Sequence, residues 1–300
     1  MIADVRKNLN LLPRLEDGWT FLYIEHRQIH QDAFGVNVVS EQGVVQLPIS
    51  QIKVLLLGPG VSITSAAMVA IAGHGCSVIW TGENGVRFYA SGSPKTNQSA
   101  NLERQAKLWA NPADNLRVVR RMYVLRYGED FPESNNKATL RGYEGARVKQ
   151  AYTEEAARIG LIWKGRKWYK DQWDRSDHVN RCLSVASSCL YGLCHTVIAG
   201  LGFTPGLGFI HTGDMRSFTL DIADLYREKF TIPVAFAASA KSFSDNAESY
   251  TRKLCRDAFA AQDLIARLVP DVYEVMGITS AGAGMIDINA WEALKKDECW

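Results

Sequence analysis

The chain has 300 residues, of which 47% are hydrophobic and 22% charged, and it carries a formal net charge of +2. This composition is typical of a soluble globular protein and argues against a disordered or fibrous chain. A chain of this length buries enough apolar surface to fold as one large or two ordinary domains without disulfide bonds. The N-terminal stretch lacks the apolar core of an export signal, no apolar run approaches the roughly 18 residues of a membrane span, and the six cysteines form no CxxC pair. We therefore expect a reduced, cytoplasmic protein.

The charge is unevenly distributed along the chain. Residues 101–181 carry seventeen basic and eleven acidic side chains, whereas residues 182–300 carry ten basic and fourteen acidic ones. A polyanion such as DNA would be expected to bind the basic middle third. The alternative is that this segment is a solvated helical face.

The first ninety residues have the pattern of β-structure with one helix. Short runs rich in β-branched and aromatic residues predict strands within 20–31, 34–40 and 43–49. The continuous apolar run 52–58 predicts a strand buried on both sides. A helix is expected over 62–75, and two strands around a Gly-Glu-Asn-Gly turn over 76–90.

A small polar segment, residues 91–101, predicts a linker, because it has no apolar residue larger than alanine. After it, apolar residues recur at i, i+3 and i+4, which predicts helices within 102–110, 116–128, 139–160, 179–200, 221–230 and 250–269. The predicted fold class is α+β, with a small N-terminal β-rich domain over 1–90, a linker over 91–101 and a larger all-α catalytic domain over 102–300.

Glu144 lies on an apolar stripe of its predicted helix, together with Leu140, Val148 and Ala151. A carboxylate on such a stripe must find a partner, because burying it unpaired is unfavourable. The partner is either a bound cation or a basic residue one turn away on the same helix, namely Arg141 or Arg147.

Residues 206–227 bring a histidine and two aspartates together. His211 lies in a glycine-rich loop before a predicted helix, and Asp221 and Asp224 leave the same side of that helix. Oxygen ligands with one imidazole suit Mn²⁺ or Mg²⁺ better than a tetrahedral structural Zn²⁺. The structural alternative is that the acids favour the helix N-terminal dipole and His211 caps a turn.

Aromatic and basic residues interleave over 163–175. Rings that stack on bases, beside cations that meet phosphates, are what binding of single-stranded or frayed nucleic acid requires. The alternative is an amphipathic hairpin that packs its tryptophans on the helical domain. The residues concerned are Trp163, Lys164, Arg166, Lys167, Trp168, Tyr169, Lys170, Trp173 and Arg175.

Four segments in register resemble the CRISPR adaptation integrase family, and its type I-E branch in particular. They are LRGYEGARVKQAY, SSCLYG, GFIHTG and SFTLDIADLYR, and the segment ENGVRFYASG is similar to the end of the family's β domain. The resemblance runs from about Phe21 to about Ala258. It implies an N-terminal β domain, a C-terminal helical domain, a homodimer, and two such dimers that flank a dimer of a small companion subunit.

The resemblance also implies the catalytic residues. Glu144, His211 and Asp224 would be the ligands of a Mg²⁺ or Mn²⁺ ion. Asp221 would be the additional catalytic acid of the same helix turn.

A second group of residues is expected to contact DNA. The aromatic side chains of Trp168 and Trp173 would recognise the motif end of the incoming DNA, with Tyr191 as a neighbour of that pocket. His26 and Gln28 would part the end of the DNA duplex. The other residues expected to contact DNA are Arg87, Arg141, Arg147, Arg166, Lys167, Lys170, Arg227 and Arg252.

The expected reaction is a transesterification, in which the 3′-hydroxyl of a prespacer DNA fragment attacks a phosphodiester at the edge of the CRISPR repeat. Two other functions remain open. One is a catalytically silent DNA-binding scaffold of the acquisition complex, and the other is a stand-alone metal-dependent nuclease that acts on branched DNA.

Overall fold

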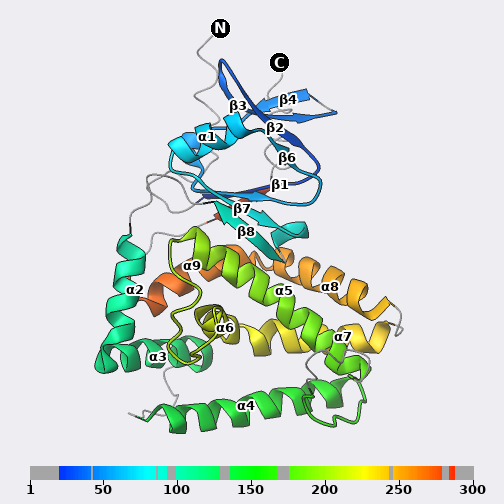
Figure 1. Ribbon diagram of the computed structural model, residues 1–300. Coiled ribbons are helices and arrows are strands. Elements are labelled where there is room, and N and C mark those ends of the chain that lie inside the picture. Colours follow the sequence, from blue (N-terminus) through cyan, green and yellow to red (C-terminus); the bar gives the residue numbers. More distant parts are fainter. Residues whose placement is uncertain are drawn as a thin grey trace. The chain divides into compact units, whose positions relative to one another are not determined.

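The computed structural model describes residues 20–41, 43–85, 87–92, 99–128, 136–167, 176–242, 246–278 and 284–287 (Figure 1). The chain forms two compact units. The first contains residues 1–102, 196–203 and 263–300, and the second contains residues 103–195 and 204–262. Strands come first along the chain and helices follow, so the predicted α+β fold class is confirmed.

A five-stranded sheet lies in the first unit, in the order β8-β7-β5-β1-β9. Strands β1 (Thr20–Ile24), β5 (Val54–Leu57), β7 (Ser77–Thr81) and β9 (Gly284–Asp287) run parallel, and β8 (Phe88–Gly92) runs antiparallel to β7. All four residues of β5 are buried. The apolar run at this position therefore forms the predicted strand that is covered on both faces.

A second sheet of four strands has the order β4-β3-β2-β6. Its members are β2 (Gln28–Asp32), β3 (Gly35–Ser40), β4 (Gly43–Gln46) and β6 (Ser62–Ile63). Two short 3₁₀ turns, η3 (Ile49–Gln51) and η4 (Glu83–Gly85), interrupt the connections of this unit. The predicted run 20–31 is divided between the two sheets, because His26 has a left-handed φ of 52° and ends β1 before β2 begins.

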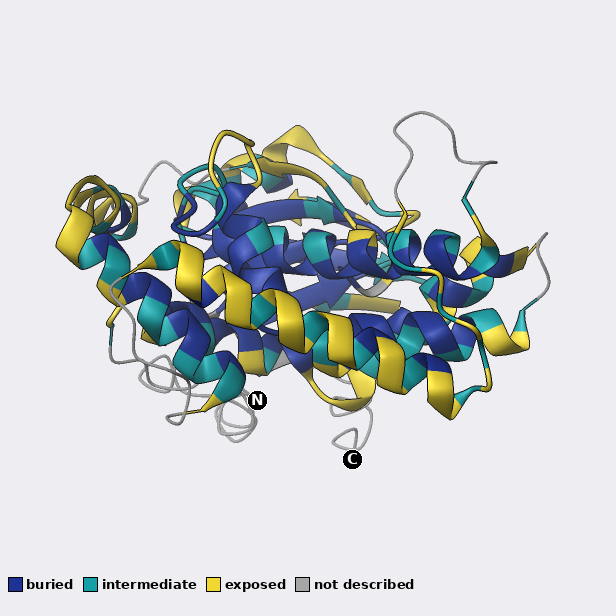
Figure 2. Cartoon of the chain, turned by 90° about the horizontal axis from the view of Figure 1, so that it is seen from below, coloured by how far each residue is buried: buried dark blue, intermediate teal, exposed yellow. Residues whose placement is uncertain are grey.

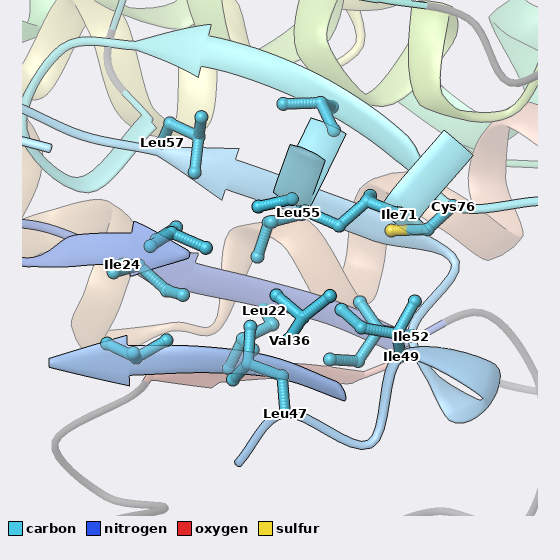
Figure 3. Packing of buried hydrophobic residues seen from close by; sticks show 14 residues of the cluster. Leu22, Ile24, Val36, Leu47, Ile49, Ile52, Leu55, Leu57, Ile71 and Cys76 are labelled. Carbon is cyan, nitrogen blue, oxygen red and sulfur yellow. The ribbon is translucent and has the colours of Figure 1, made fainter. Parts of the chain in front are cut away.

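The core of the first unit lies between the two sheets (Figure 3). Alternate residues of β1 and β5 point into it, because side chains of a strand alternate between its faces. Helix α1 (Ser65–Gly73) closes this core with Ile71, and Thr64 caps the helix by accepting the N–H of Ala67 at 3.3 Å. The labelled residues of the core are Leu22, Ile24, Val36, Leu47, Ile49, Ile52, Leu55, Leu57, Ile71 and Cys76.

The other face of the five-stranded sheet is covered by the end of helix α5 (His178–Gly200). A Cβ on Gly200 would lie 3.1 Å from Val54 Cγ2 and 3.4 Å from Phe21 Cε1, so the helix backbone approaches the strands closely. Helix α9 (Leu264–Val275) belongs to the same unit, with Tyr273 packed edge-on to Phe203 at 6.2 Å. The predicted division placed all of 102–300 in the helical domain. The structure instead groups 196–203 and 263–300 with the sheets, because the end of α5 packs on β1 and β5 and β9 pairs with β1.

The second unit is helical. It contains α3 (Pro112–Tyr127), α4 (Lys137–Arg158), α6 (Ser217–Asp224), the π-helical turn η6 (Arg227–Thr231), α7 (Ile232–Lys241) and α8 (Ala247–Ala261), together with most of α2 (Ala100–Ala110) and α5. The helix predicted over 250–269 is two helices, because Asp263 adopts a left-handed φ of 42° between α8 and α9. Figure 2 shows exposed residues along one side of these helices and buried residues along the other.

Helix α5 is long and apolar enough, by length and composition, to cross a membrane. However, 72% of its most apolar 18-residue window is buried inside the structure. This degree of burial is typical of the central helix of a globular core.

Candidate metal centre and nucleic-acid interface

Asp221 of α6 anchors the loop that carries His211. Its Oδ2 accepts the backbone N–H groups of Phe209 at 2.5 Å and Ile210 at 3.1 Å, and its Oδ1 accepts the N–H of His211 at 2.8 Å. The residue is 1% exposed. A buried carboxylate is stable when hydrogen bonds satisfy it, and this one takes three successive backbone donors.

The same carboxylate orients the His211 ring. Nδ1 of His211 lies 2.8 Å from Oδ1 of Asp221, while Nε2 faces Oδ2 of Asp224 at 3.8 Å. The hydrogen bond with Asp221 raises the pKa of His211 above its ordinary value, burial opposes this, and the charge of Asp224 adds to it. A neutral His211 that donates from Nδ1 presents a lone pair on Nε2, which is how metal-ligating histidines are usually arranged.

Asp221 was predicted as an additional catalytic acid that could hold a second ion. Both of its oxygens bind the loop and its side chain is buried, so Asp221 positions His211 in this structure, and its catalytic role stays a prediction.

Side chains of helix α4 bind the backbone carbonyl groups of the same loop. Nζ of Lys137 donates to the backbone oxygen of Phe209 at 3.1 Å, and Nη2 of Arg141 donates to the backbone oxygen of Ile210. The loop is therefore clamped by an acid through its N–H groups and by two cations through its C=O groups. Arg141, which was predicted to contact DNA, contributes its guanidinium to this clamp.

Glu144 lies one turn further along α4 and is held by α3. Oε1 of Glu144 pairs with Nη1 of Arg126 at 2.5 Å, and Oε2 accepts a hydrogen bond from the Tyr123 hydroxyl at 3.0 Å. Glu144 therefore forms an ion pair, as the structural alternative predicted, but its partner lies on α3 and not on its own helix. Arg147 instead lies over the ring of Tyr127, with 4.8 Å from guanidinium carbon to ring centroid.

Arg126 joins a second acid to this cluster. Its Nη2 pairs with Oε1 of Glu228 at 2.8 Å, and the Tyr127 hydroxyl donates to the same oxygen at 2.9 Å. The sequence prediction missed these residues. The sequence did contain a pattern that indicates burial of Arg126. Helical spacing places it on the same stripe as Val119, Met122 and Tyr123, all of which are buried.

Asp224 is nearly enclosed by the site. Burial raises its pKa, Arg227 and Arg126 oppose this with their positive charges, and Glu144 adds to it. Nη1 of Arg227 pairs with Oδ1 of Asp224 at 3.1 Å. Tyr191 belongs to the same environment, since burial raises its pKa and the charges of Arg227 and Asp224 act on it. Arg227 and Tyr191, both predicted for DNA, therefore lie beside the predicted ligand Asp224.

The donor set fits a hard divalent cation. The 3.8 Å between His211 Nε2 and Asp224 Oδ2 is shorter than twice the roughly 2.1 Å of a Mg²⁺–ligand contact, so one ion could reach both atoms. The charge of Glu144 acts on both His211 and Asp224. As they stand, no three His, Cys, Asp or Glu residues in the described part of the chain are grouped closely enough for a metal site. Glu144 is paired with Arg126 in this arrangement, and the full set of three ligands stays a prediction.

Part of the aromatic and basic segment is internal to the helical unit. Trp163 packs on Tyr152 at 5.0 Å and on Phe236 at 5.3 Å, so this tryptophan belongs to the helical core. Arg166 is also internal, with Nη1 bound to Asn180 Oδ1 at 2.9 Å and Nη2 bound to Ser184 at 3.0 Å. The side chain of Lys167 is exposed. Trp168, Lys170 and Trp173 lie outside the described residues.

The remaining residues predicted at DNA are on the surface. His26 and Gln28 are exposed and line an open groove of about 490 Å³ in the first unit. Arg87, just before β8, is exposed. Arg252 of α8 pairs with Glu248 at 3.5 Å. The contact of these side chains with DNA stays a prediction.

The sequence model of the family described as "CRISPR associated protein Cas1" matches residues 22–126 and 123–246. The chain belongs to the Cas1 family. It is 42% identical over 266 residues to "CRISPR-associated endonuclease Cas1 2" of Thermus thermophilus, covering 89% of this chain and 82% of the relative. It is 35% identical over 269 residues to "CRISPR-associated endonuclease Cas1" of Escherichia coli K12, covering 89% and 88%. The predicted family resemblance is confirmed.

Solved Cas1 structures share the fold. The structure described as "TtCas1-DNA complex" superposes with a TM-score of 0.82 and 40% identity, and covers 88% of this chain and 99% of that one. A casposase bound to its integration product superposes with a TM-score of 0.56 at 14% identity, which is evidence of the fold alone.

Proposed function

We propose that this Cas1-family protein joins the 3′-hydroxyl ends of prespacer DNA to the CRISPR repeat by metal-dependent transesterification. The observation that carries the proposal is the orientation of His211. Asp221 fixes its Nδ1 at 2.8 Å, and its Nε2 faces the Asp224 carboxylate at 3.8 Å. A bound Mg²⁺ or Mn²⁺ would stabilise charge on the phosphoryl oxygens and lower the pKa of the attacking hydroxyl.

The chain's own residues would provide binding and alignment. His211, Asp224 and Glu144 would hold the ion, and Asp221 keeps the imidazole in the tautomer that ligation needs. Lys137 and Arg141 bind the backbone carbonyls of the same loop, which would help to keep His211 in position. Such alignment matters because phosphoryl transfer depends on in-line positioning of the reacting groups.

DNA is the proposed substrate for two reasons. The solved neighbour at 40% identity is described as a complex with DNA, and residues 101–181 carry an excess of six positive charges. We also propose that the protein is cytoplasmic and acts as a homodimer, with two dimers flanking a dimer of a small companion subunit. Sedimentation of the chain alone and with that subunit would test this assembly.

The reaction itself is tested with labelled prespacer DNA, Mn²⁺ and a supercoiled plasmid that carries a repeat, with and without the companion subunit. Joined products that require Asp224 support the integrase. Cleavage of branched DNA without joining supports a nuclease, the activity for which the relatives are named. Binding without any reaction supports a silent scaffold and would overturn the proposal.

A further inference from the structure

Arg126 connects two carboxylates that lie on different elements. Its Nη1 pairs with Glu144 of α4 at 2.5 Å, and its Nη2 pairs with Glu228 of η6 at 2.8 Å. The arginine side chain is only 4% exposed, whereas the two glutamates are 15% and 22% exposed. A guanidinium with both ends engaged by carboxylates has a fixed plane, so it holds each partner in one orientation.

Two tyrosines of α3 complete the arrangement. Tyr123 donates to Glu144 at 3.0 Å and Tyr127 donates to Glu228 at 2.9 Å, and their rings stack 6.3 Å apart. Each glutamate thus receives one hydrogen bond from Arg126 and one from a tyrosine. The two donors bind separate oxygens of Glu144, the proposed ligand, but the same oxygen of Glu228, which has no assigned role.

The positive charge of Arg126 also acts on Asp224. The buried guanidinium is paired with both Glu144 and Glu228, and the charge of Asp224 also acts on it. A buried cation surrounded by acids lowers their mutual repulsion, which would otherwise be strong in a poorly solvated site. In the metal-free protein, Arg126 therefore provides charge of the same sign as the divalent ion.

We propose that Arg126 serves as the counter-cation of Glu144 and Asp224 before a divalent ion binds and competes with that ion for Glu144, with Glu228 as its anchor. This proposal rests on the proposed function, because it concerns the same site. Glu228 has a distinct part in it. When Glu144 binds the ion, Arg126 stays paired with Glu228, so Arg126 is not left as an unpaired buried cation.

The proposal predicts effects of opposite sign on ion affinity. Arg126→Gln removes a positive charge that repels the ion and competes with it for Glu144, so we expect Mn²⁺ to bind roughly tenfold more tightly. Glu228→Gln removes the anchor's charge and leaves Arg126 more strongly engaged with Glu144, so we expect Mn²⁺ to bind roughly tenfold more weakly. Calorimetric titration of the full chain with Mn²⁺, without DNA, measures both.

Thermal unfolding provides a second measurement. Arg126→Gln should lower Tm in EDTA, because Glu144 and Asp224 lose their counter-charge, and Mn²⁺ should raise the Tm of this variant by more than it raises that of the wild type. Glu228→Gln keeps the hydrogen-bond acceptor for Tyr127, so this variant tests the proposal even if Arg126→Gln fails to fold.

Arg147→Gln is the matched control. It removes the same charge from a guanidinium that lies over the Tyr127 ring, whereas the arginine that binds Glu144 and Glu228 is Arg126. We expect its Mn²⁺ affinity to stay within about twofold of the wild type, since the pairwise Coulomb effect of a more exposed cation is screened.

The outcomes separate this proposal from the proposed function. Wild-type protein that binds Mn²⁺ only as weakly as Asp224→Ala would overturn both. Wild type that binds Mn²⁺ through Asp224, while Arg126→Gln and Glu228→Gln both weaken binding or leave it unchanged, overturns the role of Arg126 and leaves the function standing. Equal losses of Tm with EDTA and with Mn²⁺ would likewise reduce Arg126 to a structural ion pair.

Discussion

Nδ1 of His211 lies 2.8 Å from Oδ1 of Asp221, and the same carboxylate accepts the backbone N–H of His211. One buried acid therefore sets both the backbone and the ring of one histidine. The arrangement leaves Nε2 as the ring atom available to the site. It also makes the protonation of His211 dependent on Asp221, which gives the first prediction.

Asp221→Asn should lower the pKa of His211, because the hydrogen bond to the carboxylate is the main cause of its elevation. In the wild type, a raised His211 pKa stabilises the fold below the unfolded value of about 6.5, and that contribution disappears as pH rises through the folded pKa. The variant should lose this pH dependence of Tm. It should also lose about 2–4 kcal/mol of stability, since an amide oxygen cannot replace both carboxylate oxygens. NMR titration of the ring in EDTA measures the pKa, and a His211 pKa unchanged by the substitution would contradict the assignment.

Asp224→Asn should stabilise the metal-free protein while abolishing joining. Burial raises the pKa of Asp224, so its contribution to stability is present below the ordinary carboxyl pKa and is lost as pH rises through the raised value. At neutral pH the ionised side chain therefore opposes folding. We expect a gain of about 0.5–2 kcal/mol in EDTA, as is common when a functional site is neutralised. Urea unfolding at neutral pH measures it, and a large destabilisation would mean that Asp224 is chiefly a structural partner of Arg227.

Arg141→Ala should slow joining without changing how DNA binding responds to salt. Its guanidinium holds the carbonyl of Ile210, so its loss should displace His211 and reduce the rate roughly 10- to 100-fold. A phosphate contact would instead reduce the slope of log affinity against log salt by about one. Fluorescence anisotropy over a series of salt concentrations distinguishes these roles. A reduced slope would restore Arg141 to the DNA interface.

The sequence predicted the elements of this site better than their contacts. Glu144 was found because an acid on an apolar stripe needs a partner, and the helix α4 does carry that stripe, with Leu140 buried and Glu144 and Val148 half-buried. The partner could not be found in the same way. Arg126 lies eighteen positions earlier in the chain, and helical spacing describes only neighbours on one helix.

The division of the chain into two units likewise depends on contacts that sequence spacing does not predict. Periodicity correctly indicated strands before residue 92 and helices after it. It could not indicate that β9, near the end of the chain, pairs with β1, because register between distant strands depends on tertiary packing. Asp221 was likewise identified as an acid of the site, but its role followed only from the three N–H groups that face it.

Arg166 and Lys167 are adjacent and offer a matched comparison. Arg166→Ala should cost about 2 kcal/mol of stability, because its guanidinium bonds with Asn180 and Ser184 connect this segment to α5. Lys167→Ala should change stability by less than about 0.5 kcal/mol, since the side chain is exposed. If Lys167 meets a phosphate, its loss should also reduce the salt slope of DNA binding by about one. Equal stability losses for the two variants would contradict the internal role of Arg166.

Gly208 provides the sharpest steric test of the His211 loop. A Cβ at this position would lie 2.4 Å from the backbone oxygen of His211 and 2.6 Å from the carbonyl carbon of Ser217. Neither backbone atom can move without shifting the loop or the start of α6, so Gly208→Ala should abolish joining and weaken Mn²⁺ binding by at least roughly tenfold. Gly206→Ala is the control, because its Cβ would approach Met215 no closer than 3.7 Å, an ordinary contact distance. We expect that variant to retain both activities. Full activity of Gly208→Ala would show that the loop is not held in the conformation that places Nε2 of His211 beside Asp224.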